Sequence, residues 1–528
     1  MQDKPKTPSF IHEFQLVTTQ KDNRMLTTRL EAGRCLYNAC LGETFKRLAM
    51  MRSSKKWRSA IKKKKSKLRT KMFKAARNKA EYTEYHLHGY VGTLRNSCWI
   101  RDHIDSLTAQ KIATRAFNAV SDYEFGKHGK PRFKRRGWMS SLEGKNNKSG
   151  IRWCDDHVEW SGLRLNCVFD KKDKFGVQAH ALSHDVKYVR LVKKTVRGNL
   201  RWFAQLVLKG TAKIKRENMI GTETVGLDIG PSTGAIVGDS DALLLEFCPE
   251  VEIPYRQIRV VQRKMARSLR SANPDNYNEN GTTTAGAGKG KKRWIFSAKY
   301  RALKAELAEL QRVLAETRKR VHGKLVKKIL TLGTDIKTEK LSYKALQRTF
   351  GKSISRRAPG MFMSMLRRKA ENAGGKVTEF STRSTKLSQA CHCGEVHKKP
   401  LSQRWHTCSC GVTTQRDLYS AFLAKHVSND ILDTRQAAAS WPGANLLLER
   451  AVLRVHHEAA NGRIHPASFG IINKRANIMN RRQRCPLKTD QRQSMPATSL
   501  LLPKSLSVLP LEPSVFRHGV GQKLLTCK

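Results

Sequence analysis

The sequence has no long apolar run and no apolar leader. It contains no stretch of about 18 consecutive apolar residues, the length that a membrane-spanning helix needs. Its opening residues, MQDKPKTPSF, lack the apolar core of a signal peptide. These absences argue against membrane and secreted proteins, so we expect an intracellular protein with no membrane part.

Cysteine is also scarce. Twelve cysteines in 528 residues are too few for a disulfide scaffold. Four of them gather in the motifs CHCG and CSCG, and in a reducing compartment such a cluster indicates metal ligands. The other cysteines are scattered, and we interpret them as ordinary packing residues: Cys35, Cys40, Cys98, Cys154, Cys167, Cys248, Cys485 and Cys527.

Acidic residues are few beside the basic ones. The chain has 102 Lys and Arg against 43 Asp and Glu, a net charge of +59 and a pI near 10.4. A merely soluble basic surface is the alternative, but an excess this large repels itself unless a partner neutralises it. A membrane surface is less favoured than a polyanion. The charge therefore predicts a nucleic-acid partner.

The length predicts several domains, since 528 residues exceed what one hydrophobic core usually holds. Strand-like patterns at 10–18, 164–169, 187–193 and 200–208 indicate a β-rich domain over 1–44 and 126–219. Apolar spacing between them predicts a basic helical insertion over 45–125.

Two segments of this half concentrate basic residues. From Arg52 to Lys79 there are fourteen Lys or Arg and no acid, and the interleaved apolar residues favour a packed helix with one basic face over a solvated surface. The segment GKHGKPRFKRRGW, 126–138, predicts a loop or edge strand that contacts phosphates and stacks bases; an ordinary basic turn is the alternative. The predicted nucleic-acid contacts are Lys62, Lys63, Lys64, Lys65, Arg132, Lys134, Arg135 and Arg136.

A second domain is predicted over 220–428. VGLDIG, TGAIVGD and ALLLEF indicate three consecutive strands, followed by a helical insertion at about 255–330 whose leucine spacing predicts a helix ending near Leu330. A zinc ribbon is expected at 386–413 within this domain. Residues 429–528 are predicted to be a poorly ordered extension with one amphipathic helix at 444–457, because PATSLLLPKSLSVLPLEPSV breaks its apolar runs with proline.

Three acidic residues of this domain are candidate metal ligands. Asp228 lies mid-strand between Leu227 and Ile229, where a carboxylate needs a partner or a metal unless the strand end faces water. Glu339 follows a short strand-like segment and competes with Asp335, four residues earlier; the alternative to a ligand is a surface charge. Asp417 opens an apparent helix, so its alternative is a helix N-cap. Carboxylates that converge from distant segments are what a metal-dependent phosphodiesterase needs.

The cysteine cluster is the more specific signal. Cys391, Cys393, Cys408 and Cys410 form two Cys-x-Cys pairs, each followed by glycine, and four thiolates satisfy a tetrahedral Zn²⁺. Such a site has no open position and is structural. The alternative is a histidine in place of one thiolate, with three candidates: His392, His397 and His406.

The order of these motifs carries a resemblance. GLDIG, a helical insertion, a strand ending in Glu339, the motifs SxxCxCG and CxCG, and then QRDLYSAFLA resemble the RuvC nuclease domain of the TnpB family and of the related type V CRISPR effectors. The likeness spans roughly residues 10–428 and includes GRCLYN and GKPRFKRR in the N-terminal half. Two features depart from the family pattern: Cys-x-Cys replaces Cys-x-x-Cys, and about 100 residues follow the last motif.

The resemblance implies a multidomain α/β protein. It would consist of an RNase H-like (RuvC) nuclease domain with an inserted zinc ribbon, and an N-terminal wedge-like β-barrel with a helical insertion. Asp228, Glu339 and Asp417 would bind two catalytic Mg²⁺ ions, beside one structural Zn²⁺. The implied partners are a guide RNA and a target double-stranded DNA.

The implied function is RNA-guided DNA cleavage next to a short flanking motif, in association with a transposon, by a cytoplasmic, nucleoid-associated prokaryotic protein. Three alternatives remain: a small type V CRISPR effector, a guide-dependent DNA-binding repressor without cleavage, and a basic structural or ribosome-associated protein with a zinc ribbon. The presence of all three acids weighs against the last two.

Overall fold

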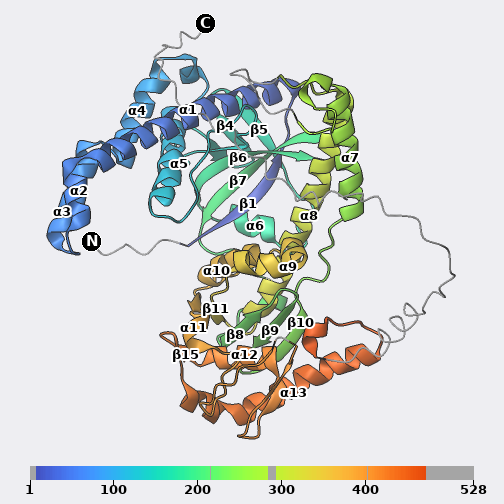
Figure 1. The fold of residues 1–528 in the computed structure, drawn as a ribbon. Coiled ribbons are helices and arrows are strands. Elements are labelled where there is room, and N and C mark those ends of the chain that lie inside the picture. Colours follow the sequence, from blue (N-terminus) through green and yellow to red (C-terminus); the bar gives the residue numbers. More distant parts are fainter. Residues whose placement is uncertain (1–7, 215, 284–292, 401, 471–528) are drawn as a thin grey trace. The chain divides into compact units, whose positions relative to one another are not determined.

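The computed structural model describes residues 8–214, 216–283, 293–400 and 402–470, and these form a mixed α/β protein (Figure 1). The proline-broken segment near residue 500 and two of the scattered cysteines, Cys485 and Cys527, lie outside the described residues. Among the described helices, none combines the length and the apolar character needed to cross a membrane.

The chain between Ser9 and Lys209 contains a seven-stranded antiparallel sheet with strand order β2-β6-β7-β1-β5-β4-β3. The sequence produces it through alternation; along β5, for example, every second side chain is buried. The two edge strands are three residues long and are not paired with each other, so the expected barrel is an open half-barrel in the described chain. The strands are β1 (Ser9–Leu16), β2 (Ser141–Glu143), β3 (Arg152–Cys154), β4 (His157–Trp160), β5 (Leu163–Val168), β6 (Val186–Val196) and β7 (Asn199–Lys209).

Helices fill the chain between β1 and β2, and the first of them follows β1 directly. Thr19 and Asp22 form a capping box that starts α1 at Gln20, and the apolar spacing then continues without a break. The helices of this part are α1 (Gln20–Ser53), α2 (Lys55–Lys62), α3 (Lys67–Lys79), α4 (Glu84–Asn96), η1 (Trp99–Asp102), α5 (Ser106–Glu124) and, between β5 and β6, α6 (Val177–Leu182).

A second, five-stranded sheet has the order β10-β9-β8-β11-β12. The first three strands form an antiparallel meander, while β11 and β12 run parallel to β8. A parallel neighbour needs a long crossover, and helices α7 and α8 supply it between β10 and β11; α8 ends at Leu330, where the leucine spacing predicts. The elements are η2 (Arg216–Asn218), β8 (Thr224–Ile229), β9 (Thr233–Val237), β10 (Ala242–Glu246), α7 (Tyr255–Ser271), η3 (Pro274–Asn276), α8 (Ala298–Leu330), β11 (Asp335–Glu339), α9 (Tyr343–Arg357), α10 (Pro359–Asn372) and β12 (Lys376–Phe380).

The first part of the predicted C-terminal extension, residues 429–470, is more ordered than the sequence predicts. Residues 429–470 belong to the fold, because the amphipathic helix expected at 444–457 is a 27-residue helix that buries Ala437, Leu448, Ala451 and Val455. The last elements are α11 (Thr382–Thr385), β13 (Trp405–Thr407), β14 (Thr413–Gln415), α12 (Arg416–Lys425), β15 (Val427–Ser428), β16 (Ile431–Leu432), α13 (Thr434–Ala460) and η4 (Ala467–Phe469).

Candidate metal centres and basic surfaces

Asp228 and Glu339 lie next to each other on two neighbouring parallel strands. The register pairs Thr338 of β11 with Leu227 of β8. Glu339 and Asp228, the next residues on the two strands, therefore lie side by side. Leu227 and Ile229 are buried on the opposite face, and both carboxylates are half-buried on one face of the sheet. The pairing of β8 with β11 therefore brings together two acids that are 111 positions apart in the sequence.

Helix α12 brings the third acid to this face. Gly226, two residues before Asp228, lies against the backbone of α12: a Cβ on it would come within 1.8 Å of the carbonyl oxygen of Ala421. At the other end of the helix, Lys337 Nζ donates hydrogen bonds to the carbonyls of Lys425 (2.8 Å) and Val427 (3.0 Å). Contacts at Ala421 and at Lys425 thus fix α12 on the sheet, and its first turn lies beside the ends of β8 and β11.

Asp417 lies in that first turn, but it is not the N-cap. The helix begins at Arg416, and Gln415 is its N-cap, with the side-chain oxygen accepting from Leu418 N at 2.8 Å. The cap interpretation of Asp417 is therefore wrong, because the capping oxygen comes from two residues earlier. Asp417 is half-buried instead and accepts a 3.4 Å hydrogen bond from Thr233 Oγ1 at the start of β9.

The electrostatics of the three acids are those of carboxylates sharing a site. Burial, and after it the negative charges of Asp417 and Glu339, raises the pKa of Asp228 well above its usual range, while Arg416 opposes the rise. Burial also raises the pKa of Glu339, although hydrogen bonds from the Leu387 backbone and the Thr385 side chain oppose it. The three acids are less tightly gathered than the cysteines, because their carboxylate oxygens do not all lie within 4.8 Å of one another.

These residues fit divalent cations. Carboxylate oxygens are the ligands that Mg²⁺ prefers. Burial is the main reason that the pKa of Asp228 is raised, and a bound dication would offset both the burial and the repulsion by Asp417 and Glu339. Four residues that were not predicted as part of the site position the acids: Gly226, Thr233, Gln415 and Lys337. Gly226, Thr233 and Gln415 lie inside the motifs VGLDIG, TGAIVGD and QRDLYS, and membership in these motifs was the only signal that could have identified them.

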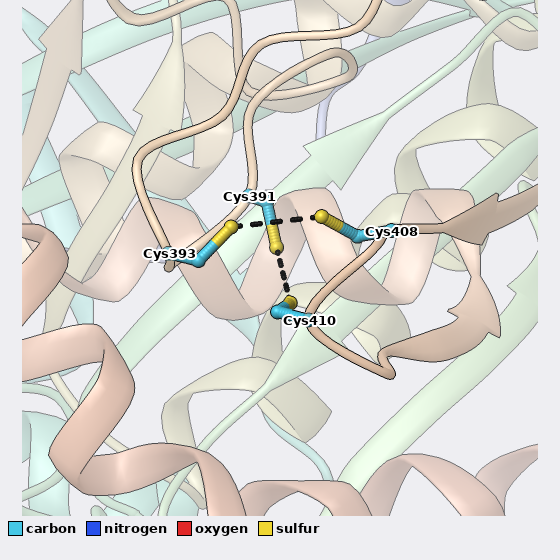
Figure 2. Close-up of side chains that lie close together, drawn as sticks. All are labelled: Cys391, Cys393, Cys408 and Cys410. Atoms are coloured by element: carbon cyan, nitrogen blue, oxygen red, sulfur yellow. Dashed lines mark hydrogen bonds between the residues drawn. The ribbon is translucent and has the colours of Figure 1, made fainter.

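The four cysteines come together at one point (Figure 2). Their sulfur atoms all lie within 4.8 Å of one another, with 3.5 Å between Cys391 and Cys410 and 3.5 Å between Cys393 and Cys408. Tetrahedral zinc with Zn–S bonds of about 2.3 Å separates its sulfurs by about 3.8 Å. The cluster thus has nearly the dimensions of a tetrathiolate zinc site.

Two turns of the same design build this cluster. In each, the glycine N–H donates to the carbonyl of the first cysteine, Gly394 to Cys391 at 3.0 Å and Gly411 to Cys408 at 3.1 Å. Both glycines have a positive φ, 98° and 92°, which a residue with a side chain rarely adopts. The glycine after each Cys-x-Cys pair therefore closes the turn that presents the two thiols.

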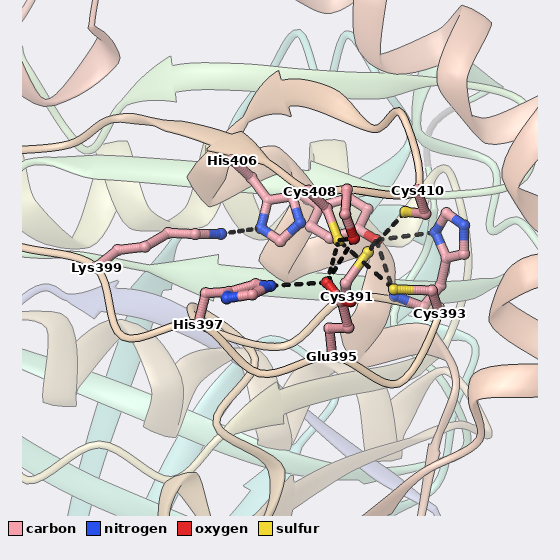
Figure 3. A network of polar contacts seen from close by, with 11 residues as sticks. Cys391, Cys393, Glu395, His397, Lys399, His406, Cys408 and Cys410 are labelled. Carbon is pink, nitrogen blue, oxygen red and sulfur yellow. Dashed lines mark hydrogen bonds and ion pairs between the residues drawn. The ribbon is translucent and has the colours of Figure 1, made fainter.

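The three histidines that could replace a thiolate have other partners; Figure 3 labels two of them, His397 and His406. His392 Nδ1 lies 2.9 Å from Tyr419 OH, and His397 Nε2 lies 2.8 Å from Glu395. His406 contacts Lys399, and burial together with that charge lowers the pKa of His406 to about 4. All four thiols are already gathered, so the geometry favours the tetrathiolate set.

Tyr419 connects the cysteine cluster to the helix that carries Asp417. Its hydroxyl lies 3.2 Å from Cys391 Sγ and accepts a 3.0 Å hydrogen bond from the backbone N–H of His392. The ring is buried in α12, two residues after Asp417. The first knuckle and the third acid are therefore joined by one side chain.

Residues 360–423 match the family model described as Cas12f1-like, TNB domain. This TNB-like segment contains α10, β12, all four clustered cysteines and Asp417. No curated protein matches the chain.

Two solved structures are similar to the chain in part. A cryo-EM structure of a Cas12f1–sgRNA–target DNA complex is 10% identical with a TM-score of 0.40, covering 79% of this chain and 98% of that one. A cryo-EM structure of a CRISPR-Cas12f ternary complex is 11% identical with a TM-score of 0.23, covering 79% and 83%. A likeness of this degree assigns no residue and no activity.

The lysine run lies at the turn between α2 and α3. The single packed helix predicted from Arg52 to Lys79 is instead two helices, α2 and α3, that pack together through Trp57 and Phe73, whose ring centroids are 4.6 Å apart. The break follows from the lysine run itself, where like charges in succession disfavour a helix and Ser66 caps the next one. All four lysines are exposed at this turn: Lys62, Lys63, Lys64 and Lys65.

The second basic segment is a loop, as predicted, and it is fixed to α1. Asn38 holds the backbone of Lys134 from both sides, accepting from its N–H at 2.8 Å and donating to its carbonyl at 2.9 Å. The quoted motifs GRCLYN and GKPRFKRR thus meet at this point. Around it, a set of basic and aromatic side chains is exposed: Arg132, Phe133, Arg135, Arg136 and Trp138.

Proposed function

We propose that this chain is a Mg²⁺-dependent, RNA-guided DNA endonuclease of the TnpB type. The observation that carries the proposal is the meeting of Asp228, Glu339 and Asp417 on one face of a mixed five-stranded sheet, which supports the RNase H-like fold implied by the sequence. The TNB-like segment supports the same assignment, because it includes Asp417 and belongs to a model described as Cas12f1-like.

In this proposal the three carboxylates hold the cations through their oxygens, and the surrounding residues keep them in place. Bound there, two Mg²⁺ ions would supply activation of a water and stabilisation of the leaving 3′ oxygen of a DNA phosphodiester. Thr233 fixes the Asp417 carboxylate by a hydrogen bond, and Thr385 and the Leu387 backbone orient Glu339. Arg416, whose charge lowers the pKa of Asp228, favours the ionised form that binding requires.

The cysteine cluster takes the structural role. Cys391, Cys393, Cys408 and Cys410 would hold one Zn²⁺ with no open coordination position, so the ion contributes folding energy and no reaction step. The Tyr419 contact places that stabilisation beside Asp417.

The nucleic-acid partners would be a guide RNA and a target double-stranded DNA. The guide would pair with the target while the protein reads a short flanking motif and the shape of the duplex. A net charge of +59 suits two polyanions at once. Exposed aromatic rings beside cationic side chains, such as Phe133 beside Arg132, suit base stacking and phosphate contact.

The test is plasmid cleavage by the Asp228→Asn protein. Purified with its co-purifying RNA and supplied with Mg²⁺, the variant should bind matched DNA nearly as well as the wild type and fail to cut it, because one oxygen ligand is lost with little change in shape. Asp275→Asn, an exposed acid in the same half of the chain, is the matched control and should cut normally. A variant that cuts within a few-fold of the wild type would remove Asp228 from the site.

The basic residues have their own test. Replacing Lys62, Lys63, Lys64 and Lys65 by Gln should weaken binding and flatten its salt dependence, since each lost phosphate contact removes roughly one unit from the log–log slope. If the exposed turn is only a solvated charge cluster, the slope will not move.

A second candidate function is a small type V CRISPR effector with the same chemistry. The description of the family model, Cas12f1-like, favours it. Sequencing the RNA that co-purifies with the protein separates the two: a transcript of a transposon end supports the TnpB type, and a repeat-derived transcript supports the effector. Wild-type protein that binds matched DNA and never cuts it would support a guide-dependent repressor instead.

A further inference from the structure

A cluster of different chemistry lies at the edge of the seven-stranded sheet. In the hairpin of β3 and β4, Cys154 pairs with His157 and Arg152 pairs with Glu159. Cross-strand partners and alternate residues share a face, so the thiol, the imidazole and the carboxylate point to the same side. Their ligand atoms all lie within 4.8 Å of one another.

His157 is oriented like a metal ligand. Its ring is buried, 8% exposed, and Nδ1 lies 2.6 Å from Asp156 Oδ1. Histidines that bind metals almost always have the second ring nitrogen held by a carboxylate or carbonyl, which fixes the tautomer and the ring plane. Here that arrangement directs Nε2 towards Glu159 Oε1, 3.3 Å away.

The turn between the two strands is tight. Asp155 has a φ of 48°, a conformation that costs a residue with a side chain, and Asp156 N donates to Cys154 O at 2.6 Å. This turn brings the Cys154 thiol next to the His157 imidazole, although only two residues separate them in the sequence. The turn therefore holds two of the three candidate ligands together, and Glu159 joins them from the same face of β4.

We propose that Cys154, His157 and Glu159 form a second zinc site, which binds one Zn²⁺ through sulfur, nitrogen and oxygen. The donor set suits a borderline-soft dication, with the fourth position left to water. Binding displaces the thiol proton of Cys154 into solvent. The ion fastens β3, a three-residue edge strand with few ladder hydrogen bonds of its own, to β4.

Arg152 does not block this site. Its guanidinium contacts Glu159 Oε2 at 2.6 Å, while the other carboxylate oxygen, Oε1, faces His157. One oxygen can therefore pair with arginine while the second binds the ion. The competing explanation is an imidazolium held between Asp156 and Glu159 with no metal.

Zinc content of the full-length protein tests the proposal independently of DNA cleavage. After zinc loading and removal of free metal, the wild type should retain about two equivalents, one for each site. Cys154→Ser with His157→Ala should lose one equivalent and keep the other. Cys98→Ser, a half-buried single cysteine, is the matched control and should lose none.

The converse variant isolates the new site. Cys393→Ser with Cys410→Ser should keep about one equivalent, and its Co²⁺ form should show the absorption of a single thiolate ligand. Asp156→Asn retains all three ligands and should weaken this residual zinc binding about 10- to 100-fold. Amide hydrogen exchange in residues 152–160 should slow when zinc is added.

Some outcomes would overturn the proposal. If Cys154→Ser with His157→Ala leaves the zinc content of a folded protein unchanged, the cluster is an ion-pair network. The same conclusion follows if the variant does not fold but Asp156→Asn binds zinc as tightly as the wild type, or if both ring nitrogens of His157 carry protons in zinc-loaded protein. Loss of DNA cleavage alone would bear on the proposed function and not on this site.

Discussion

The four cysteines and the three carboxylates are neighbours in the fold, but the chain assembles them in different ways. The cysteines lie between residues 391 and 410, and two copies of one short turn gather them. The carboxylates lie between residues 228 and 417 on two strands and a helix, and they meet only if α12 docks on the sheet. A cluster of residues close in the sequence can be inferred from their spacing. A cluster of residues far apart in the sequence depends on how helices and strands pack, which a short motif does not reveal.

The two clusters also differ in how closely their ligand atoms are spaced. Four thiols within 4.8 Å leave room for one tetrahedral ion and nothing else. The carboxylates are less closely gathered, and burial, followed by the charges of Asp417 and Glu339, raises the pKa of Asp228. The first arrangement suits an ion that holds the fold, and the second suits ions that must also contact a substrate.

The largest effect should follow removal of the zinc ligands. Structural zinc in small fingers contributes about 10–16 kcal/mol of apparent binding energy, so Cys408→Ser with Cys410→Ser should release the ion and unfold the TNB-like segment. Metal analysis and thermal melting measure both results, with Cys98→Ser as the control. A double variant that melts like the wild type would show that the turns hold the cysteines without any metal.

Asp417→Asn should next lower DNA cleavage about a thousandfold, or roughly 4 kcal/mol, and leave the melting temperature unchanged. The reason is that Asp417 is not the helix cap. Gln415→Ala is the reciprocal variant: it removes the cap, so it should cost about 1 kcal/mol of stability and spare most of the activity. If the two variants exchanged these phenotypes, the assignment of Asp417 as a ligand would be wrong.

Gly226→Ala should disturb the carboxylates through the backbone. The new methyl group would lie 1.8 Å from the Ala421 carbonyl oxygen, so α12 must move, at a cost of about 1–3 kcal/mol. We expect a lower melting temperature and a loss of cleavage, with zinc still bound. Gly323→Ala, in open space on α8, is the matched control and should stabilise by up to about 1 kcal/mol. Equal tolerance of both changes would contradict the tight docking of α12.

The smallest effect is expected at the connection between the clusters. Tyr419→Phe removes the hydroxyl that contacts Cys391 and accepts from His392 N, which should cost about 1 kcal/mol and weaken zinc retention against a chelator. Cleavage should fall only a few-fold, because the ring that packs α12 remains. Unchanged zinc release would mean that the two clusters are independent.

Local signals predicted much of the fold. Alternation located β1, β5, β6 and β7, and the leucine spacing placed the end of α8 at Leu330. Glycine after each Cys-x-Cys pair was correctly singled out, although its reason, a positive φ that closes a turn, is visible only in the backbone. The proposed roles of the acids remain predictions.

Other features depended on contacts that the sequence does not reveal. Asp417 was weighed as a cap because aspartate caps helices well, but the buried Gln415 beside it takes that position. The exact start of the first helix, Gln20, is set by one capping box, and the lysine run interrupts the helix predicted across it. Cys154 was interpreted as a packing residue, since a single cysteine has no spacing signal until the hairpin register pairs it with His157.

Helix α13 packs on α12, and this packing limits how far the chain can be shortened from its C-terminal side. The last recognisable motif ends in α12, but Trp441 of α13 packs against Tyr419 and Phe422, with ring centroids 5.3 and 5.5 Å apart, and against His392 at 5.3 Å. A chain cut after Ser428 would expose these rings to water and leave the helix of Asp417 covered on one side only. A shortened derivative of this chain should therefore retain α13.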